Sequence, residues 1–400
     1  MAGRFEILEE REFRLLWLGQ ATSALGSSLV PVALAFAVIE QSSASALGLV
    51  LSAGFVSRAV LLLLGGVVAD RLPRQSVMLG ADLLRTASQG LVAALLIIGH
   101  AHVWQLVVLI ALFGAGDAFF APASTGLVPE TVRAERLQQA NALMSLSRSV
   151  AWVAGPMISG LLVAGIGPGS VFAIDAFTFA VSTGSLARLR LPRSASDDSR
   201  ATVLRDLRGG WCEVRSRTWV WATVVRFSIS NLAIAPLFVL GPLVAQASLG
   251  GATAWGLIGT AGGLGAVIGD TAALRLRPGR PLLAGGLAAA LWALEPALLA
   301  RPFPTAVIAV AAALGFGAAG FSNALWFTAL HERIPRQALS RVSSYDWLGS
   351  IVFQPAGFAF AGPLAAVIGA PATLLGSAAV QASACIAASL SPSIRSLRSP

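Results

Sequence analysis

Long apolar segments with few charged residues follow one another along almost the whole chain. Twelve of them reach the roughly 20 residues that a helix needs to cross a bilayer: 13–38, 45–69, 76–99, 103–128, 139–165, 168–189, 218–246, 253–274, 281–300, 304–329, 338–366 and 370–390. About a quarter of the residues in a soluble domain are charged, whereas this chain of 400 residues is 12% charged and 56% hydrophobic. The pattern predicts an all-α, multi-pass membrane protein with twelve transmembrane helices and excludes a soluble globule.

The connections between these segments form two sets that differ in charge. All 28 basic residues are arginines. Twenty-three of them lie at the two termini or in the connections that contain residues 71–74, 132–136, 188–217, 275–280 and 331–341, and the other connections contain only Arg301. Because loops rich in positive charge stay in the cytoplasm, we expect both termini to be cytoplasmic. Arginine without lysine, together with abundant Ala, Gly and Leu, suggests a GC-rich bacterial genome and therefore the bacterial inner membrane.

Other classes of function find little support in the residues. The net charge of +9 does not indicate a nucleic-acid partner, because the arginines lie in short loops and not along one helix face. The only histidines, His100, His102 and His331, lie at the membrane edges, so no catalytic or metal-binding group is expected within the spans. A nucleotide-binding loop of the GxxxxGK[ST] type would need lysine. We expect no enzyme activity, no cofactor and no direct use of ATP.

The two halves of the chain resemble each other. Gly65 and Asp70 have counterparts 200 residues later in Gly265 and Asp270. Six segments precede a charged stretch and six follow it, which predicts two pseudo-symmetric six-helix bundles at residues 1–189 and 218–400. Residues 190–217 would form the cytoplasmic linker, in which Thr202–Arg217 could make a short amphipathic helix.

The sequence GGVVADRLPRQSVM at Gly65–Met78 interrupts the first half with a cluster of charge. The order of four of its residues resembles the signature loop between helices 2 and 3 of the major facilitator superfamily: Gly66, Asp70, Arg71 and Arg74. This resemblance implies a gate, in which Asp70 caps the cytoplasmic start of the segment 338–366 near Gln337–Arg341. The alternative is a short loop whose arginines only orient the protein in the bilayer.

The sequence AGPMISG at Ala154–Gly160 resembles the Gly-Pro motif of the antiporter branches of this superfamily. The match consists of Gly155, Pro156 and Gly160, and Ser159 stands where the family usually has a further glycine. Pro156 removes one helical hydrogen bond, and the small residues allow close helix packing. The resemblance favours antiport over uniport.

A third stretch narrows the resemblance. The sequences FFAPAS at Phe119–Ser124, LVPE at Leu127–Glu130 and RLQQANAL at Arg136–Leu143 resemble the macrolide- and siderophore-exporting branch of drug:proton antiporters. This implies a secondary active transporter that couples protons to the efflux of hydrophobic or amphipathic small molecules by alternating access. The alternative is a facilitator or importer of a small nutrient without proton antiport.

Nine charged residues lie at least five residues inside the ends of the predicted spans, where each is costly unless it is paired or hydrated. They are Asp82, Asp117, Asp175, Glu295, Asp346, Arg58, Arg85, Arg148 and Arg226. Asp82 and Arg85, three residues apart, are expected to form a local ion pair. The resemblance pairs Asp117 with Arg74, and Arg148 and Arg226 are expected to extend toward the cytoplasm.

Proton coupling and substrate binding each have sequence candidates. Asp117 and Asp175 are the candidates for exchanging a proton during the transport cycle. Four helices line the cavity in the family, and their side chains supply most of the substrate-cavity candidates: Arg58, Phe36, Phe119, Phe120, Phe238 and Trp326. The alternative for about half of the aromatic residues is contact with lipid. The expected partners are the lipid bilayer, a small-molecule substrate and protons, and a monomer is expected.

Overall fold

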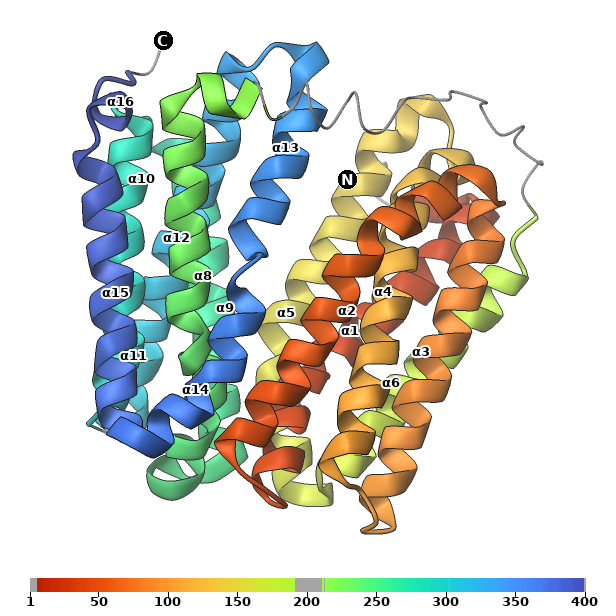
Figure 1. The fold of residues 1–400 in the computed structure, drawn as a ribbon. Coiled ribbons are helices and arrows are strands. Elements are labelled where there is room, and N and C mark those ends of the chain that lie inside the picture. Colours follow the sequence, from red (N-terminus) through yellow and green to blue (C-terminus); the bar gives the residue numbers. More distant parts are fainter. Residues whose placement is uncertain (1–5, 191–210, 212, 302, 399–400) are drawn as a thin grey trace. The chain divides into compact units, whose positions relative to one another are not determined.

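The computed structural model describes residues 6–190, 211, 213–301 and 303–398, and all regular structure in these residues is helical (Figure 1). The side chains of some residues within helices, Asp70, Gln337 and Arg341 among them, lie outside the described part. So does most of the predicted linker, including the larger part of the amphipathic helix expected at Thr202–Arg217, of which residues 211 and 213–216 are described and helical. The chain divides into two compact units, Met1–Asp198 and Ser199–Pro400. We describe each unit by itself.

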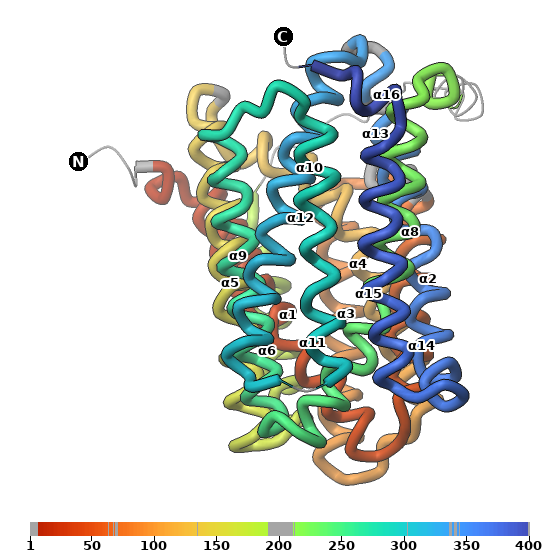
Figure 2. Tube along the Cα trace, turned by 90° about the vertical axis from the view of Figure 1, so that its left-hand side faces the viewer, coloured from red at the N-terminus to blue at the C-terminus, as the bar shows by residue number. Residues whose placement is uncertain are grey.

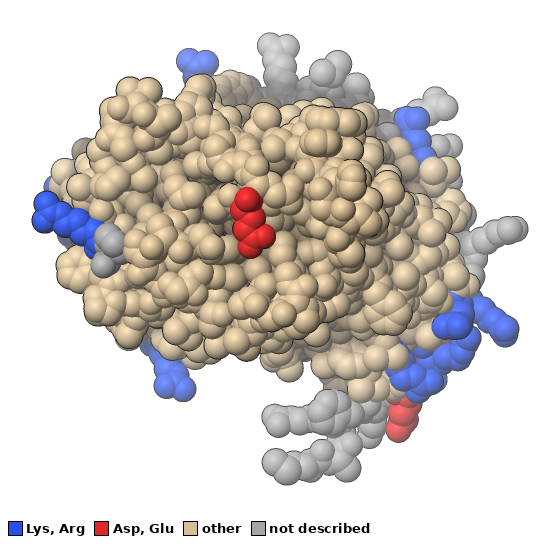
Figure 3. All heavy atoms as spheres, turned by 90° about the horizontal axis from the view of Figure 1, so that it is seen from below, with Lys and Arg blue, Asp and Glu red and all other residues tan. Residues whose placement is uncertain are grey.

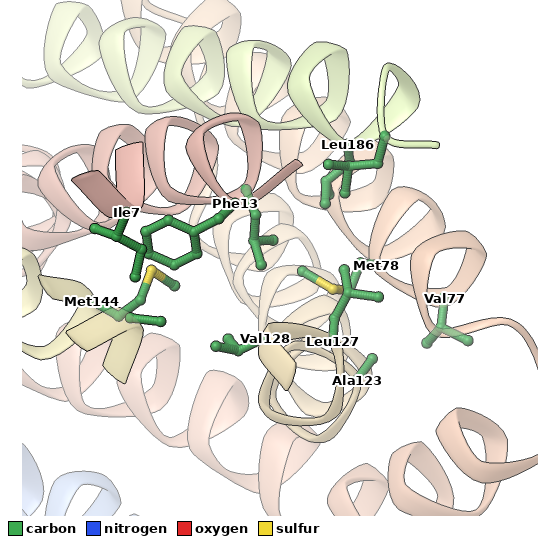
Figure 4. Packing of buried hydrophobic residues seen from close by; sticks show 12 residues of the cluster. Ile7, Phe13, Val77, Met78, Ala123, Leu127, Val128, Met144 and Leu186 are labelled. Carbon is green, nitrogen blue, oxygen red and sulfur yellow. The ribbon is translucent and has the colours of Figure 1, made fainter. Parts of the chain in front are cut away.

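Within its described residues, 6–190, the first unit consists of six long helices and two short 3₁₀ turns, Glu6–Glu9 and Ala134–Arg136. The long helices are α1 (Arg11–Ile39), α2 (Ala44–Arg71), α3 (Arg74–Ile97), α4 (Val103–Thr131), α5 (Leu137–Ile166) and α6 (Pro168–Ala187). Helix α2 packs on α4, α1 on α5 and α6, and α3 on α4 and α6. A core of buried side chains joins α1, α3, α4 and α5 through Phe13, Met78, Leu127 and Met144 (Figure 4).

The second unit contains the other six predicted segments, and its helices are interrupted more often than those of the first unit (Figure 2). Its elements are α8 (Thr218–Val244), a π-helical turn (Ala245–Leu249), α9 (Gly251–Arg275), α10 (Pro281–Ala289), a 3₁₀ turn (Ala290–Ala293), α11 (Leu294–Leu299), α12 (Thr305–Arg333), α13 (Arg336–Ile351), α14 (Gln354–Ile368), α15 (Ala370–Leu390) and α16 (Pro392–Arg395). Helix α9 packs on α12, and α8 packs on α13, α14 and α15.

Two of the predicted continuous segments are divided in the structure, and a proline accounts for each break. Pro296 cannot donate a hydrogen bond to the preceding turn, and the helix tightens to a 3₁₀ turn at Ala290–Ala293 before α11 begins. Pro355 is at the start of α14, where a missing N–H is tolerated. The regular helix is interrupted at Val352 and Phe353, although their backbone angles stay in the right-handed helical region.

Eleven helical stretches in the described residues are long and apolar enough to cross a membrane. The sequence predicted twelve, and the exception is α3. Helix α3 has 24 residues, but Asp82, Arg85 and Gln89 lower its hydropathy. Seen from below, charged side chains are few and mostly at the edges of the face (Figure 3). The fold is therefore that of a multi-pass membrane protein in which one long helix is markedly polar.

The two units repeat one close helix contact. A Cβ atom at Gly65 of α2 would collide with the carbonyl oxygen of Ala118 in α4. A Cβ atom at Gly265 of α9 would collide in the same way with the carbonyl oxygen of Ala313 in α12. Glycine permits these backbones to approach because it has no side chain. The shared contact agrees with the sequence similarity of the halves, although the exact domain limits at residues 189 and 218 stay a prediction.

Candidate functional site

Four charged side chains from α2, α3 and α4 form a network inside the first unit. The Arg85 guanidinium pairs with Asp82, and its Nη1 donates to Oδ1 of Asp117 over 3.1 Å. Arg58 approaches Oδ2 of Asp117 at 3.5 Å. The hydroxyl of Ser182 in α6 donates to Oδ2 of Asp82 over 2.6 Å. The expected pair between Asp82 and Arg85 is confirmed, and it belongs to a larger network that contains two acids and two arginines.

Arg85 is the centre of this network. Its guanidinium lies over the ring of Phe120 at 3.9 Å and over that of Phe179 at 4.5 Å, which are favourable cation–π distances. A Cβ atom at Gly116 would come within 2.7 Å of Cγ of Arg85, so glycine makes room for the arginine stem. Arg85 is 5% exposed and Asp82 is fully buried. One buried cation is thus shared between two carboxylates.

An open hollow of about 220 Å³ adjoins the network, and we call it the α1–α5 hollow. Side chains from all five of these helices line it. The charged ones are Arg58, Arg85, Asp117 and Arg148; the polar ones are Gln20, Ser23, Ser27, Ser124 and Ser147; the apolar ones are Ala21, Ala24, Phe120, Ala121 and Met144. Apolar and charged groups therefore face the same space.

Asp175 of α6 lies deep in the first unit and has a different environment. The Nε2 amide of Gln89 in α3 donates to its Oδ2 over 2.6 Å. The other carboxylate oxygen, Oδ1, and the Oε1 of Gln89 are both buried and have no hydrogen-bond partner among the described residues. Both side chains are fully buried. The two proton candidates therefore differ: Asp117 borders the α1–α5 hollow, and Asp175 does not.

Arg74 does not pair with Asp117, contrary to the expectation from the sequence. Its Nη1 donates to Oε1 of Glu130 over 2.8 Å and to the carbonyl of Gly126 over 2.7 Å. Arg74 begins α3, whereas Asp117 precedes Gly126 by nine residues, or roughly 13 Å along a helix. The arginine cannot span that distance while it contacts the end of α4.

In the second unit, Arg226 is buried and does not extend toward the cytoplasm as the sequence predicted. It is 5% exposed, its Nη2 donates to Ser322 Oγ over 3.3 Å, and its guanidinium lies 4.2 Å from the ring of Phe227. Nearby, the indole N–H of Trp326 donates to Oδ2 of Asp346 over 3.0 Å. Packing between α8 and α12 holds the arginine inside because polar and aromatic partners are available there.

The cavity candidates occupy several environments. Arg58 and Phe120 line the α1–α5 hollow. Phe119 is partly buried and packs against the core of the first unit, and Phe36 is 1% exposed. In the second unit, Trp326 is 1% exposed, and Phe238 packs edge-on against Phe358 at 6.5 Å between ring centroids. The structure thus brings two of the six candidates to the hollow, and substrate contact by the others stays a prediction.

Comparison with known proteins identifies the family. Residues 2–287 match the family model described as transmembrane secretion effector, which is part of the major facilitator superfamily. The chain belongs to this family. It is therefore a membrane transporter of the major facilitator type, and not an enzyme.

Several characterised transporters are similar to the chain. Macrolide efflux protein A of Streptococcus pyogenes is 24% identical over 59% of each chain, and the multidrug efflux pump Tap of Mycolicibacterium fortuitum is 29% identical over 57% of this chain and 56% of its own. The chain thus spans less than two thirds of the length of these curated relatives. The crystal structure of a mutant of the nucleoside transporter NupG matches with a TM-score of 0.74 at 12% identity, over 95% of this chain and 98% of that one, which shows the shared fold.

The Gly-Pro motif of α5 packs closely against α1 in the first unit. A Cβ atom at Gly155 of α5 would collide with Ser28 of α1, and the hydroxyl of Ser159 donates to the Leu29 carbonyl over 2.6 Å. Pro156 lies within α5, and Gly160 is buried. Ser159 thus joins α5 to α1 by a hydrogen bond.

The gating motif is described only in part. A Cβ atom at Gly66 would meet nothing within 4 Å, whereas Gly65 beside it is tightly packed. Arg71 is exposed at the end of α2, and Arg74 makes the contacts given above. The side chain of Asp70 lies outside the described residues, as do those of Gln337 and Arg341. The expected cap therefore stays a prediction.

Sequence reasoning missed several residues of the site. Gln89 and Ser182 contact the buried acids, and Gln20 and Ser147 line the hollow. One signal could have found Gln89: Asp82, Arg85 and Gln89 follow the spacing i, i+3, i+7, which places them on one face of a helix. The other contacts depend on which helices pack together.

Proposed function

We propose that this transporter exports hydrophobic or amphipathic small molecules across the bacterial inner membrane by proton-coupled alternating access. The observation that carries the proposal is the network of Asp82, Arg85, Asp117 and Arg58 beside the α1–α5 hollow. Charges within a membrane span are costly and usually functional. The relatives named as a macrolide efflux protein and a multidrug efflux pump support efflux as the direction of transport.

Asp117 is the member of the network placed to exchange a proton. Its side chain is 24% exposed and borders the hollow, whereas Asp82 is fully buried. Protonation of Asp117 would remove its electrostatic attraction for Arg58. Arg85 would stay in its ion pair with Asp82. Antiport follows if the hollow holds the substrate while Asp117 is ionised and releases it when Asp117 takes up a proton, because substrate and proton then never occupy the site together. Asp175 is the second candidate, with one carboxylate oxygen that lacks a partner among the described residues.

The membrane orientation and the remaining partners are part of the same proposal. With the arginine-rich connections in the cytoplasm, both termini lie inside the cell. The lipid bilayer, a small-molecule substrate and protons are the proposed partners, with the chain acting as a monomer and without nucleic acid. Neither a cofactor nor a metal ion is part of this mechanism.

One observation favours the alternative, a facilitator without proton antiport. The side chains of α1 that line the hollow include no acid, and Ser27 is among them. A facilitator would move its substrate only down the substrate's own gradient. An antiporter would also move it uphill when a pH gradient is imposed.

Transport in proteoliposomes tests the proposal. Uptake of erythromycin, ethidium and a catecholate siderophore is measured with and without an imposed pH gradient. We expect gradient-driven accumulation that Asp117→Asn abolishes while substrate exchange without a gradient continues. Glu135→Gln is the matched control, because Glu135 is an exposed acid outside the network. Movement of every compound only down its own gradient would overturn proton antiport and support the facilitator.

A further inference from the structure

We propose that the α1–α5 hollow binds the acidic group of an amphipathic anion, so that carboxylates or comparable acids are among the exported molecules. The inference rests on the function proposed above and adds the chemistry of its substrate. It follows from an excess of positive charge and of free hydrogen-bond donors around the hollow. All the residues that carry it belong to the first unit.

The charges that line the hollow do not balance. Asp82 and Asp117 together match Arg85 and Arg58. Arg148 of α5 also lines the hollow, and no hydrogen bond or ion pair joins it to another described residue. It lies eleven residues after the start of α5, or roughly 16 Å along the helix. The Arg148 side chain is exposed, and no described group of the first unit supplies the anionic partner that a cation within a membrane span needs.

The hydrogen-bonding groups show the same imbalance. The Nε2 amide of Gln20 is buried beside the hollow without a partner among the described residues. Arg58 is 44% exposed and its one ion pair within the described part of the chain is with Asp117, at 3.5 Å, which leaves most of its N–H groups available. Asp117, the carboxylate among the described lining residues, already accepts from Arg85. The free groups are therefore donors, and a carboxylate, with two acceptor oxygens, complements arginine forks.

The rest of the lining suits an apolar body attached to that acidic group. Phe120, Met144 and the alanines of α1 face the same space as the arginines. The hollow has a volume of about 220 Å³, and small-molecule sites usually measure roughly 300–1,000 Å³. The hollow is smaller than this range, so it can hold only part of such a molecule, an acidic head group with an adjoining ring.

A charge series built on one fluorophore tests the inference. Purified full-length protein in phosphatidylcholine nanodiscs is titrated with dansylglycine, its neutral amide and the cationic dansyl ethylenediamine, and each Kd is measured by fluorescence. We expect dansylglycine to bind at least tenfold more tightly than the amide, and the cation to bind most weakly. Arg148→Gln and Arg58→Gln should each remove most of this preference. Arg133→Gln is the matched control, because Arg133 follows α4 and lies outside the hollow.

Each outcome supports or overturns the inference. Equal Kd values for the acid and the amide in the wild type would overturn it without any need for a variant. A preference that survives both arginine substitutions would overturn the assignment to the hollow. A Kd for dansylglycine that weakens as phosphatidylglycerol is added, and does so only while Arg58 and Arg148 are intact, would assign the anion site to a lipid headgroup and overturn its assignment to an exported molecule.

The test of anion binding and the test of proton-coupled efflux can fail independently of each other. If the acid shows no preference but a pH gradient still drives export of ethidium, the charge assignment fails and proton-coupled efflux stands. If the acid binds through Arg148 but no compound responds to the gradient, the anion site stands and proton-coupled efflux fails.

Discussion

Arg74 and Glu130 join the start of α3 to the end of α4 by an ion pair of 2.8 Å, and the same Nη1 of Arg74 also donates to the Gly126 carbonyl. The two side chains are 38% and 26% exposed. Arg74 belongs to the gating motif, and Glu130 belongs to the LVPE sequence that resembles the exporter branch. The structure thus connects two stretches of sequence that were recognised separately.

We expect Glu130→Gln to lower the free energy of unfolding by about 0.5–1 kcal/mol, because the pair is partly exposed and solvent screens it. The measurement is a denaturant titration of the purified protein in mixed micelles. Glu135→Gln is the control, since Glu135 undergoes the same change in charge nearby at an exposed position. An equal loss in both variants would show that the specific pair contributes nothing.

Gly126→Ala should disrupt the same pair from the other side. A Cβ atom at Gly126 would lie 2.5 Å from Cζ of Arg74, so the flexible guanidinium would have to move away. We expect Gly126→Ala and Glu130→Gln to be non-additive in a double-mutant cycle, with a coupling of about 0.5 kcal/mol or more. Additive losses would mean that the alanine acts through the α4 backbone and not through Arg74.

Adjacent glycines in α2 should respond in opposite ways to alanine. Gly65→Ala places a methyl group against the Ala118 backbone, which cannot move aside, and overpacking of this kind costs about 1–3 kcal/mol. Gly66→Ala meets nothing within 4 Å and removes a helix-destabilising glycine. Unfolding titrations of the two variants test this. If Gly66→Ala is stable but inactive, the motif glycine acts in the transport cycle; if both variants lose stability equally, the packing argument is wrong.

Asp82→Asn should destabilise the protein more than Asp117→Asn. Asp82 is fully buried and holds both Arg85 and Ser182, and breaking a buried pair costs roughly 3–5 kcal/mol. Asp117 is partly exposed, and its neutralisation leaves Arg85 paired with Asp82. The measurement is again the free energy of unfolding, with Ser182→Ala as a smaller perturbation of about 1 kcal/mol. The reverse order would make Asp117 the structural acid and argue against its role in proton exchange.

Most of the fold could be predicted from the sequence because a bilayer imposes a simple rule of length and polarity. The structure departs from that prediction at α3, where Asp82, Arg85 and Gln89 are polar for a specific reason: they face other side chains of the first unit. The breaks near Pro296 and Pro355 were not predicted, although proline is the residue that most often interrupts a helix. The polar helix and the two interrupted helices each depend on one to three residues, and a hydropathy value averaged over many residues does not detect them.

The contacts of the site were harder to predict, because they depend on the register between helices. The local pair of Asp82 and Arg85 was predictable, since three residues on one helix fix its geometry. The pairing of Asp117 with Arg74 was predicted wrongly. A family resemblance does not show how far apart two residues lie along the axes of neighbouring helices. The burial of Arg226 depends on Ser322, which is 96 residues away in sequence.

The pair of Asp175 and Gln89 leads to the last prediction. Gln89 donates to one carboxylate oxygen, while the other oxygen and the amide oxygen of Gln89 both lack a partner among the described residues. A single proton on Oδ1, directed at Oε1, would satisfy both atoms and complete a paired acid and amide. An asparagine at position 175 also supplies a donor, so Asp175→Asn should change the free energy of unfolding by less than about 1 kcal/mol.

Gln89→Met is the companion variant, because it keeps the volume but leaves Asp175 without the amide donor, and it should cost about 1–3 kcal/mol. In transport, Asp175→Asn should keep substrate exchange, since the neutral side chain preserves the packing of α3 on α6. A loss of several kcal/mol in Asp175→Asn would contradict this picture, because it would show that the native carboxyl group is ionised and held by its charge. The proton role would then rest on Asp117 alone.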